Sequence, residues 1–173
     1  MLRRASESDR ETLRRWRNHP DVRAVSTYRH EITPNEHAAW WSRIQDDPGT
    51  RVLVFEHEGV PAGAVTMSGH DPVTGTASWG FYLDLEGLEA RGGALSAWMA
   101  VQRDAIDYAF GEMDLAELTA EVLEHNTVVR RMNRRFGFVE GEPETCERDG
   151  RTLRIIPIRL RREDRRDHRP VSA

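Results

Sequence analysis

The sequence predicts an α/β domain with a mixed central β-sheet. Three observations lead to this prediction. Apolar residues alternate with polar ones in several short stretches, which is typical of strands. They recur every three or four residues in longer stretches, which is typical of amphipathic helices. The two kinds follow each other as strand, two helices, β-hairpin, strand, helix, strand, helix and strand, so about four helices should flank one sheet.

The composition fits a globular protein of a reducing compartment. Of the 173 residues, 38% are hydrophobic and 31% are charged, and the formal net charge is -4. So small a charge draws the chain neither to nucleic acid nor to a membrane surface. The only cysteine, Cys146, excludes an intramolecular disulfide, and no Cys/His array has zinc spacing, so we expect no metal. Without an apolar signal segment or membrane span, we expect a cytoplasmic protein.

The first part of the chain starts with a short strand at residues 2–6 and continues with a helix. Ser8 and Glu11 have the spacing of a capping box, which predicts the helix start. Pro20 is expected to end this helix, because proline cannot continue a helix interior.

A second helix has clearer boundaries. Thr33 is the expected cap, Pro34 occupies the first helical position, and Glu36 completes a capping box with Thr33. The pair Pro48-Gly49 is expected to stop the helix.

Four stretches predict strands. Residues 51–67 alternate around Glu58-Gly59 and indicate a β-hairpin. Residues 76–85 form an aromatic-rich strand, and residues 152–160 a late one. Residues 115–125 alternate as a strand would, but their Leu and Glu content leaves a helix as an alternative.

Two further helices lie in the second half. The first spans about 94–110, and its expected buried face holds seven apolar residues: Leu95, Trp98, Met99, Ala105, Ile106, Ala109 and Phe110. The second is capped by Asn126 and closed by Gly137. We expect one domain over residues 1–160, followed by a charged, flexible tail at residues 161–173.

The turn before the first of these helices contains Arg91, Gly92 and Gly93 and lacks a capping side chain. A helix N-terminus carries unpaired N–H groups and a partial positive charge, and glycine lets a ligand approach the backbone closely. Strand, glycine turn and helix therefore form a possible cradle for phosphate. The alternative is a plain tight turn. The turn matches neither a Walker A loop nor the dinucleotide-binding fingerprint.

Several motifs taken together resemble the GCN5-related N-acetyltransferase (GNAT) family. They are WGFYLD, EARGGA, DYAF, EVLEHN and the pair Gly137-Phe138. The family's pyrophosphate loop has Gln or Arg, two residues, Gly, any residue, and Gly or Ala. Residues 89–94 match this pattern except at Glu89, and Arg91 could supply the missing charge. The resemblance covers residues 76–142 and implies a mixed sheet with two splayed parallel strands.

The early stretch, residues 13–41, resembles the RimJ/RimL-like branch of this family, and more closely the N-acetyltransferases of amino-sugar nucleotides in the pseudaminic acid pathway. The resemblance implies an enzyme that transfers acetyl from acetyl-CoA to a primary amine of a small molecule, first of all a nucleotide-linked amino sugar. The alternatives are a protein or peptide N-terminus, or a non-catalytic acyl-CoA-binding module. It also allows a homodimer, since an exposed strand edge could pair with a second copy.

The resemblance implies where acetyl-CoA would bind. It would lie between the splayed strands, with its pantetheine arm along the first and the N–H of Leu83 polarising the thioester carbonyl. Asn126 would hydrogen-bond the pantetheine. The full set expected to hold the co-substrate is Phe81, Tyr82, Leu83, Arg91, Gly92, Gly93, Ala94, Leu95 and Asn126.

Direct attack by the amine needs a base, because a primary amine is mostly protonated at neutral pH. Many family members carry Glu at the position of Ser78, which could hold a water here. We expect Glu121, on the second splayed strand, to polarise that water; otherwise it is an exposed strand carboxylate. Where the family often has a Tyr acid, this chain has Asn133, which can donate a hydrogen bond but no proton.

Two groups of arginines have open roles. Arg130, Arg131, Arg134 and Arg135 could meet the 3′-phosphate of CoA or form a solvated basic face. A sugar-nucleotide acceptor would need a pocket for its own diphosphate, for which Arg17, Arg23 and Arg29 are candidates.

Overall fold

The computed structural model describes residues 1–165; residues 166–173, part of the expected tail, lie outside the described residues. The strands are β1 (Leu2–Arg4), β2 (Arg51–His57), β3 (Val60–Asp71), β4 (Thr76–Leu83), β5 (Glu117–Leu123), β6 (Val139–Glu140), β7 (Glu144–Arg148) and β8 (Arg151–Arg161). The α-helices are α1 (Arg10–Arg17), α2 (Pro20–Ala24), α3 (Pro34–Gln45), α4 (Leu85–Ala90), α5 (Ala94–Gly111) and α6 (Thr127–Arg135). Short 3-10 helices span Glu7–Asp9 and Arg162–Asp164.

All eight strands join one sheet, in the order β1-β2-β3-β4-β5-β8-β6, with β7 also paired to β8. Only β4 and β5 run parallel; every other pair is antiparallel. The expected mixed sheet is confirmed. The described residues hold six α-helices rather than about four, because the short helices α2 and α4 carry too few turns to show a periodic pattern.

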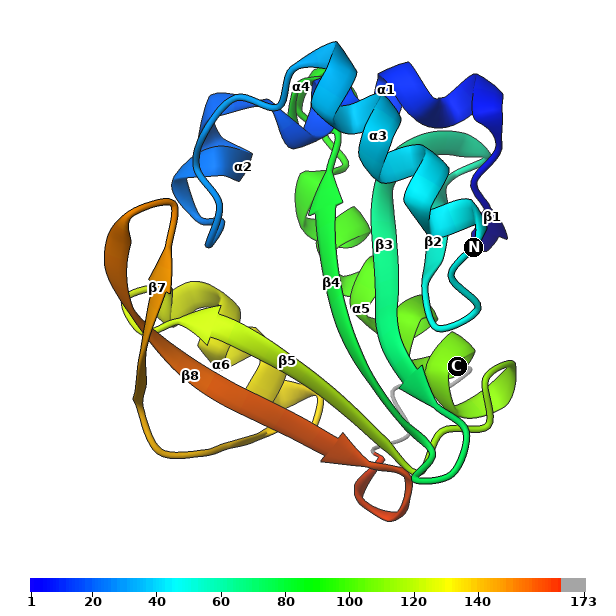
Figure 1. Cartoon of the computed structure of the whole chain (residues 1–173). Coiled ribbons are helices and arrows are strands. Elements are labelled where there is room, and N and C mark those ends of the chain that lie inside the picture. The colour runs from blue at the N-terminus through cyan, green and yellow to red at the C-terminus, as the bar shows by residue number, and fades with distance from the viewer. Residues whose placement is uncertain (166–173) are drawn as a thin grey trace.

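The parallel pair separates soon after it forms. Only Thr76–Ser78 and Glu117–Thr119 are paired across β4 and β5. Beyond these residues β4 stays bonded to β3, and β5 stays bonded to β8. The two strands therefore diverge like the arms of a V (Figure 1).

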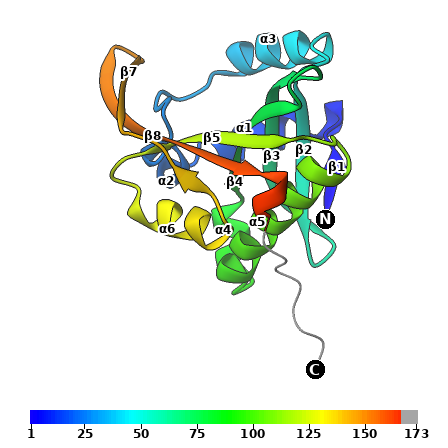
Figure 2. The ribbon, with the colours of Figure 1, turned by 90° about the horizontal axis from the view of Figure 1, so that it is seen from below.

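Helices cover both faces of the sheet (Figure 2). On one face α5 and α6 close the larger core, which includes Phe55, Val101 and Phe110. On the other face α1 and α3 cover a smaller cluster that contains Leu13 and Trp41. This arrangement leaves the space between the arms of the V to be lined by β4, β5 and the connections around them.

Two local predictions are confirmed because short-range geometry decides them. Glu58 and Gly59 both have positive φ, at 54° and 77°, as a two-residue hairpin turn requires. At the start of α3, Thr33 Oγ1 accepts a hydrogen bond from the Glu36 N–H (3.2 Å), and Glu36 accepts one from the Thr33 N–H (2.7 Å).

The capping box predicted for the first helix is wrong. The Glu11 carboxylate pairs with Arg14 (2.6 Å) instead of returning to Ser8. The N–H of Ser6 donates to Asp9 (2.8 Å), which starts a 3-10 turn before α1. Pro20 follows the end of α1 as expected, but it also begins α2, where proline lacks only an N–H that would be unpaired anyway.

The remaining assignments differ in outcome. The strand predicted over 115–125 is confirmed as β5, so the helix alternative does not hold. Leu95 was expected on the buried face of α5, but 71% of it is exposed, since it lies in the first turn, beyond the sheet. At the C-terminal end, β8 runs through Arg161, and Arg162 donates to the carbonyl of Leu115 (2.9 Å).

Candidate active site

The splayed arms expose backbone groups of β4. The N–H of Asp84 donates to the carbonyl of Ala62 in β3 (2.9 Å). Hydrogen bonds alternate along an antiparallel ladder, so the N–H groups of Phe81 and Leu83 point away from β3. They face the gap that β5 has left. Leu83 thus has the free donor that its predicted role needs.

Tyr82 does not fit the role predicted for it. Tyr82 is opposite Ala64, and the two residues form a hydrogen-bonded pair of the ladder, so β3 already uses the N–H of Tyr82. Its side chain packs on the cluster under α1 and α3, on the opposite face from the larger core. The prediction that Tyr82 pairs with pantetheine is therefore wrong in register, and Tyr82 faces the other side of the sheet.

Two predicted catalytic residues share that other side. Ala77 and Trp79 of β4 lie in the core under α5, so the intervening Ser78 points to the opposite face. On β5, Leu118 and Val122 lie in the same core, which turns Glu121 to the opposite face as well. Ser78 and Glu121 therefore stand on one face, one on each arm of the V.

Glu121 is exposed and has one basic neighbour. Arg148, at the end of β7, places its Nη2 4.0 Å from Glu121 Oε2. At this distance the pair is a weak ion pair without a hydrogen bond. Nearly half of the Glu121 side chain (47%) is exposed, so the carboxylate can accept a proton or hold a water.

The glycine turn has the backbone shape predicted for it, but some of its donors are already used. Gly92 has a φ of 65°, a conformation that favours glycine. Its N–H donates to the Glu89 carbonyl (3.0 Å), and that of Gly93 donates to the Leu88 carbonyl (2.9 Å). The N–H of Arg91 also donates to Glu89. These three amides are therefore not free for a phosphate, contrary to the expectation.

The free donors lie one turn further on. α5 begins at Ala94 without a side-chain cap, and within residues 1–165 the amides of Ala94, Leu95 and Ser96 meet no acceptor. All three residues are exposed. The anion cradle of this turn is thus the N-terminus of α5, shifted toward the helix from the predicted centre.

The sequence reasoning missed a histidine beside this cradle. His57, at the end of β2, lies with its Nε2 3.0 Å from Ser96 Oγ. The Ser96 hydroxyl donates to the Gly93 carbonyl (3.0 Å), so it accepts from His57. Nothing near His57 in the sequence signals this contact, because Ser96 lies 39 residues further along the chain.

Asn126 has the position that its predicted role requires. Its Oδ1 accepts from the N–H of Val129 (3.3 Å) and caps α6. Its side-chain NH₂ group has no partner in the described part of the chain. Asn126 can therefore donate to a ligand while it caps the helix.

Asn133 lies inside the protein, where it joins two helices. It is buried, with 3% of its surface exposed, and its Oδ1 accepts from Gln102 Nε2 (3.0 Å). This bond joins α6 to α5 inside the protein. The hydrogen bond to Gln102 and the burial favour a structural role for Asn133 over the predicted catalytic one.

The arginines of α6 divide into two pairs. Arg130 and Arg134 both bind the Glu140 carboxylate (2.8 and 2.9 Å), so internal ion pairs use them. Arg131 and Arg135 are exposed, and no described residue pairs with either. Only these two remain candidates for a phosphate contact.

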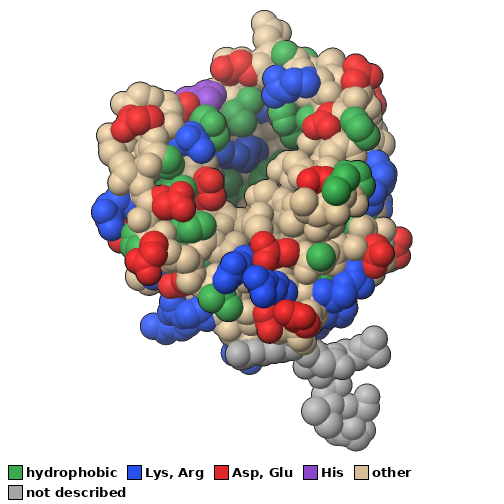
Figure 3. Space-filling model, turned by 60° about the horizontal axis from the view of Figure 1, so that its bottom comes forward, with side chains coloured by type: hydrophobic (Ala, Val, Ile, Leu, Met, Phe, Trp, Pro, Cys, Tyr) green, Lys and Arg blue, Asp and Glu red, His purple; other side chains and the backbone are tan. Residues whose placement is uncertain are grey.

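Arginines also lie near the face of the sheet that carries Ser78, Tyr82 and Glu121, which we call the acceptor face or acceptor side. Arg17, the last residue of α1, donates from Nη2 to the Tyr28 carbonyl (3.0 Å), while its Nη1 is buried without a partner in the described chain. Burial lowers the pKa of Arg17 and raises that of Tyr82. Figure 3 shows a hollow with basic side chains on its inner wall, and these are arginines because the sequence contains no lysine.

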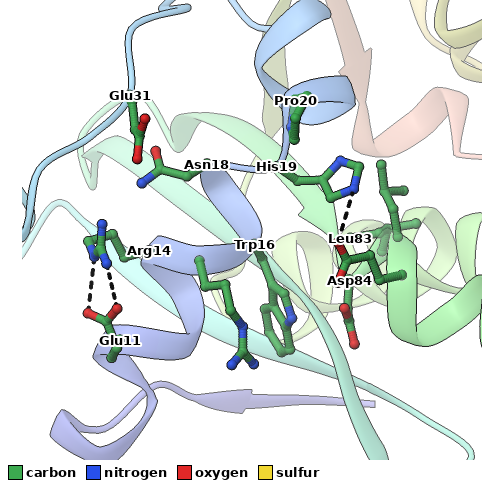
Figure 4. Close-up of a pocket in the computed structure, with 12 residues that line it drawn as sticks. Glu11, Arg14, Trp16, Asn18, His19, Pro20, Glu31, Leu83 and Asp84 are labelled. Carbon is green, nitrogen blue, oxygen red and sulfur yellow. Dashed lines mark hydrogen bonds and ion pairs between the residues drawn. The ribbon is translucent and has the colours of Figure 1, made fainter.

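A cavity of about 320 Å³ lies at the open end of β4. Trp16, Asn18 and His19 reach it from the end of α1, opposite Leu83 and Asp84 (Figure 4). His19 lies 3.7 Å from Glu86 across this cavity. The cavity therefore brings the connection between α1 and α2 close to the strand end whose N–H groups are free.

Within residues 1–165, no group of three or more His, Cys, Asp or Glu side chains is placed to hold a metal ion. No helix in the same range is long and apolar enough to cross a membrane.

Comparison with known proteins agrees with this geometry. The model of the acetyltransferase (GNAT) domain family matches residues 1–139. The structure of spermidine N-acetyltransferase from Vibrio cholerae in complex with CoA and spermine is 17% identical, with a TM-score of 0.80, covering 95% of this chain and 96% of that one. Ribosomal-protein-alanine N-acetyltransferase from Brucella melitensis is 21% identical, with a TM-score of 0.72, covering 93% and 99%. Comparison with curated proteins finds no match.

Proposed function

Because the chain belongs to the acetyltransferase (GNAT) family and is an acetyl-CoA-dependent N-acetyltransferase, we propose that it acetylates a primary amine on a small molecule. The observation that carries this proposal is the V between β4 and β5. One arm presents the unpaired N–H groups of Phe81 and Leu83, and the other presents Glu121. The free helix end at Ala94 lies just beyond the first arm.

The residues of the V fit an acyl-CoA. When bound, acetyl-CoA supplies the thioester whose carbonyl carbon the amine attacks. The N–H of Leu83 donates to the thioester oxygen, on which negative charge develops, and a donor fixed by a β-ladder needs no reorganisation. Phe81 and Asn126 hold the pantetheine arm from the two sides, and the amides of Ala94, Leu95 and Ser96 bind the pyrophosphate.

The amine must lose a proton before or during its attack. Glu121 accepts that proton, directly or through a water held by Ser78, because both side chains stand on the acceptor face. The departing thiolate takes its proton from water, since Asn133 is bonded to Gln102 inside the protein.

We take a nucleotide-linked amino sugar as the first candidate acceptor, and a protein or peptide N-terminus as the second. The amino-sugar branch is supported by the resemblance of residues 13–41. The N-terminus is supported by the fold shared with the ribosomal-protein-alanine enzyme of Brucella melitensis. Spermidine is a third, from the fold shared with the Vibrio cholerae enzyme.

The test measures thiol release from acetyl-CoA with three acceptor sets: 4-amino-sugar nucleotides, short peptides with free N-termini, and spermidine. Turnover with the amino-sugar nucleotides alone supports the first candidate. Turnover with either other set alone assigns that acceptor instead. If acetyl-CoA fails to raise the melting temperature, and no set gives thiol release, the proposed function is wrong.

A further inference from the structure

Two arginines on the acceptor side each have a buried nitrogen without a hydrogen-bond partner in the described chain. One is Nη1 of Arg17, at the end of α1, and the other is Nε of Arg29, between α2 and α3. No carboxylate among residues 1–165 forms an ion pair with either side chain. Neither guanidinium group is therefore in a contact ion pair with a carboxylate of the described residues.

A buried N–H group without a partner is unfavourable, because it loses its hydration and gains no hydrogen bond in exchange. Several other partly buried arginines pair with carboxylates. Arg3 pairs with Asp9 and Glu56 (both 2.8 Å), and Arg130 pairs with Glu140. Arg17 and Arg29 are the arginines of the described residues that have a buried nitrogen without a partner, which points to a ligand as the missing acceptor.

The two arginines lie where an acceptor would enter. Arg17 lies near Tyr82 on β4 and near the Asp149 carboxylate in the turn between β7 and β8. The N–H of Arg29 donates to the same Asp149 (3.1 Å). Tyr82 is on the face that also carries Glu121, so the arginines border the space between the two arms.

We propose that Arg17 and Arg29 bind an anionic group of the acceptor, a carboxylate or a phosphate, and so place its amine near Glu121. This inference rests on the proposed function and narrows its substrate class to amines that carry a negative charge. A guanidinium group matches both anions, because its planar N–H groups bind two oxygens at once. The same arginines repel a polyamine, which carries positive charges only.

The test uses the full-length protein saturated with CoA, so that the phosphates of CoA already occupy their own site. Calorimetry measures the binding of three probes: UDP, the dipeptide Ala-Ala and its C-terminal amide. We expect UDP or Ala-Ala to bind, and the amide to bind much more weakly than Ala-Ala. The tighter of the two anions identifies the source of the negative charge.

Two variants separate the subsite from general effects. Arg17→Gln should weaken binding of the preferred anion by roughly 30-fold or more, since it removes a charged partner from a buried contact. Arg43→Gln, at an exposed arginine of α3, should leave binding unchanged. If Arg17→Gln does not fold, Arg17→Lys keeps the charge without the planar group and should still weaken binding roughly tenfold.

The outcomes that overturn this inference differ from those that overturn the proposed function. If CoA binds but neither anion does, or if the Arg17 variants bind as tightly as the unchanged protein, the anion subsite is wrong. Acetylation of spermidine as fast as of anionic amines has the same meaning. If CoA itself does not bind, the proposed function fails first.

Discussion

Ser78 of β4 and Thr119 of β5 are the last residues that face each other before the two strands diverge. Thr119 Oγ1 also donates to the carbonyl of Ala77 (3.2 Å), which ties the strands together at the vertex. Both Ser78 and Thr119 point to the acceptor face, and Glu121 follows two residues further along β5. The pairing at Ser78 and Thr119 therefore fixes the position of Glu121, the proposed base, relative to β4.

This placement predicts the effect of Glu121→Gln. The amide cannot accept the amine proton, so kcat should fall by roughly 100-fold or more, with little change in the KM for acetyl-CoA. Steady-state kinetics against both substrates measures the two effects. Glu117→Gln is the matched control, because Glu117 shares the strand and the face but pairs with Arg161 (3.3 Å) near the vertex. Equal kcat values for the two variants would mean that the base is elsewhere.

Gly92→Ala should weaken both stability and co-substrate binding. A side chain at a φ of 65° costs about 1 kcal/mol. Gly92 lies two residues before α5, so a change in the turn should shift the first amides of this helix and raise the KM for acetyl-CoA. Gly111→Ala serves as the control, because its added Cβ meets no neighbour and its φ is not positive. Thermal unfolding and acetyl-CoA titration would compare the two, and a fully stable Gly92→Ala variant would contradict the argument.

Asn133→Ala should destabilise the protein without changing its chemistry. The substitution leaves Gln102 buried without its partner, at a cost of about 1–3 kcal/mol in the free energy of unfolding. The double variant Gln102→Met with Asn133→Leu should recover part of this loss, since it removes both polar groups. The pH dependence of kcat should not move at temperatures where Asn133→Ala is folded. A shifted pH profile would show that Asn133 takes part in the reaction.

The burial of His37 should make the stability of the protein depend on pH. The side chain is 4% exposed, and burial together with the positive charge of Arg14 lowers its pKa below the ordinary value of about 6.5. As the pH falls below that value the unfolded chain takes up a proton that the folded protein does not, so the free energy of unfolding decreases. Urea unfolding between pH 7.5 and pH 5 would measure this slope.

A control isolates the contribution of His37. His37→Phe should flatten the slope in that pH range, because no buried imidazole remains to be protonated on unfolding. His125→Gln, at an exposed histidine, should retain the slope of the unchanged protein. A slope that survives His37→Phe would assign the effect to other groups.

What could be predicted from sequence followed from local rules. The turn at Glu58-Gly59 and the box at Thr33 depend on neighbouring residues only, and both are present in the structure. The capping box predicted at Ser8 is absent because Glu11 pairs with Arg14. Arg3 of β1 binds Asp9 instead, and Asp9 caps the preceding turn. Contacts of this kind determine where a helix starts, but the spacing of residues in the sequence does not reveal them.

In the candidate site, too, local motifs were predicted correctly and contacts between distant segments were not. The motifs located the turn at Gly92 and the strands of the V, yet the turn's own carbonyls use the amides of Gly92 and Gly93. Asn133 matched a family position by counting along α6, but counting cannot show that Gln102 of another helix binds it. β7 was missed since its sequence ETCER lacks apolar alternation, and pairing with β8 alone makes it a strand.

The most direct test of the V as the acetyl-CoA site is amide hydrogen exchange at Phe81, Tyr82 and Leu83, followed by NMR. We expect Phe81 and Leu83 to exchange rapidly in the free protein and slowly with saturating acetyl-CoA. Tyr82, whose position in the ladder directs its N–H to β3, should exchange slowly in both states and serves as an internal control. Exchange at Phe81 and Leu83 that is unchanged by bound acetyl-CoA would contradict the account.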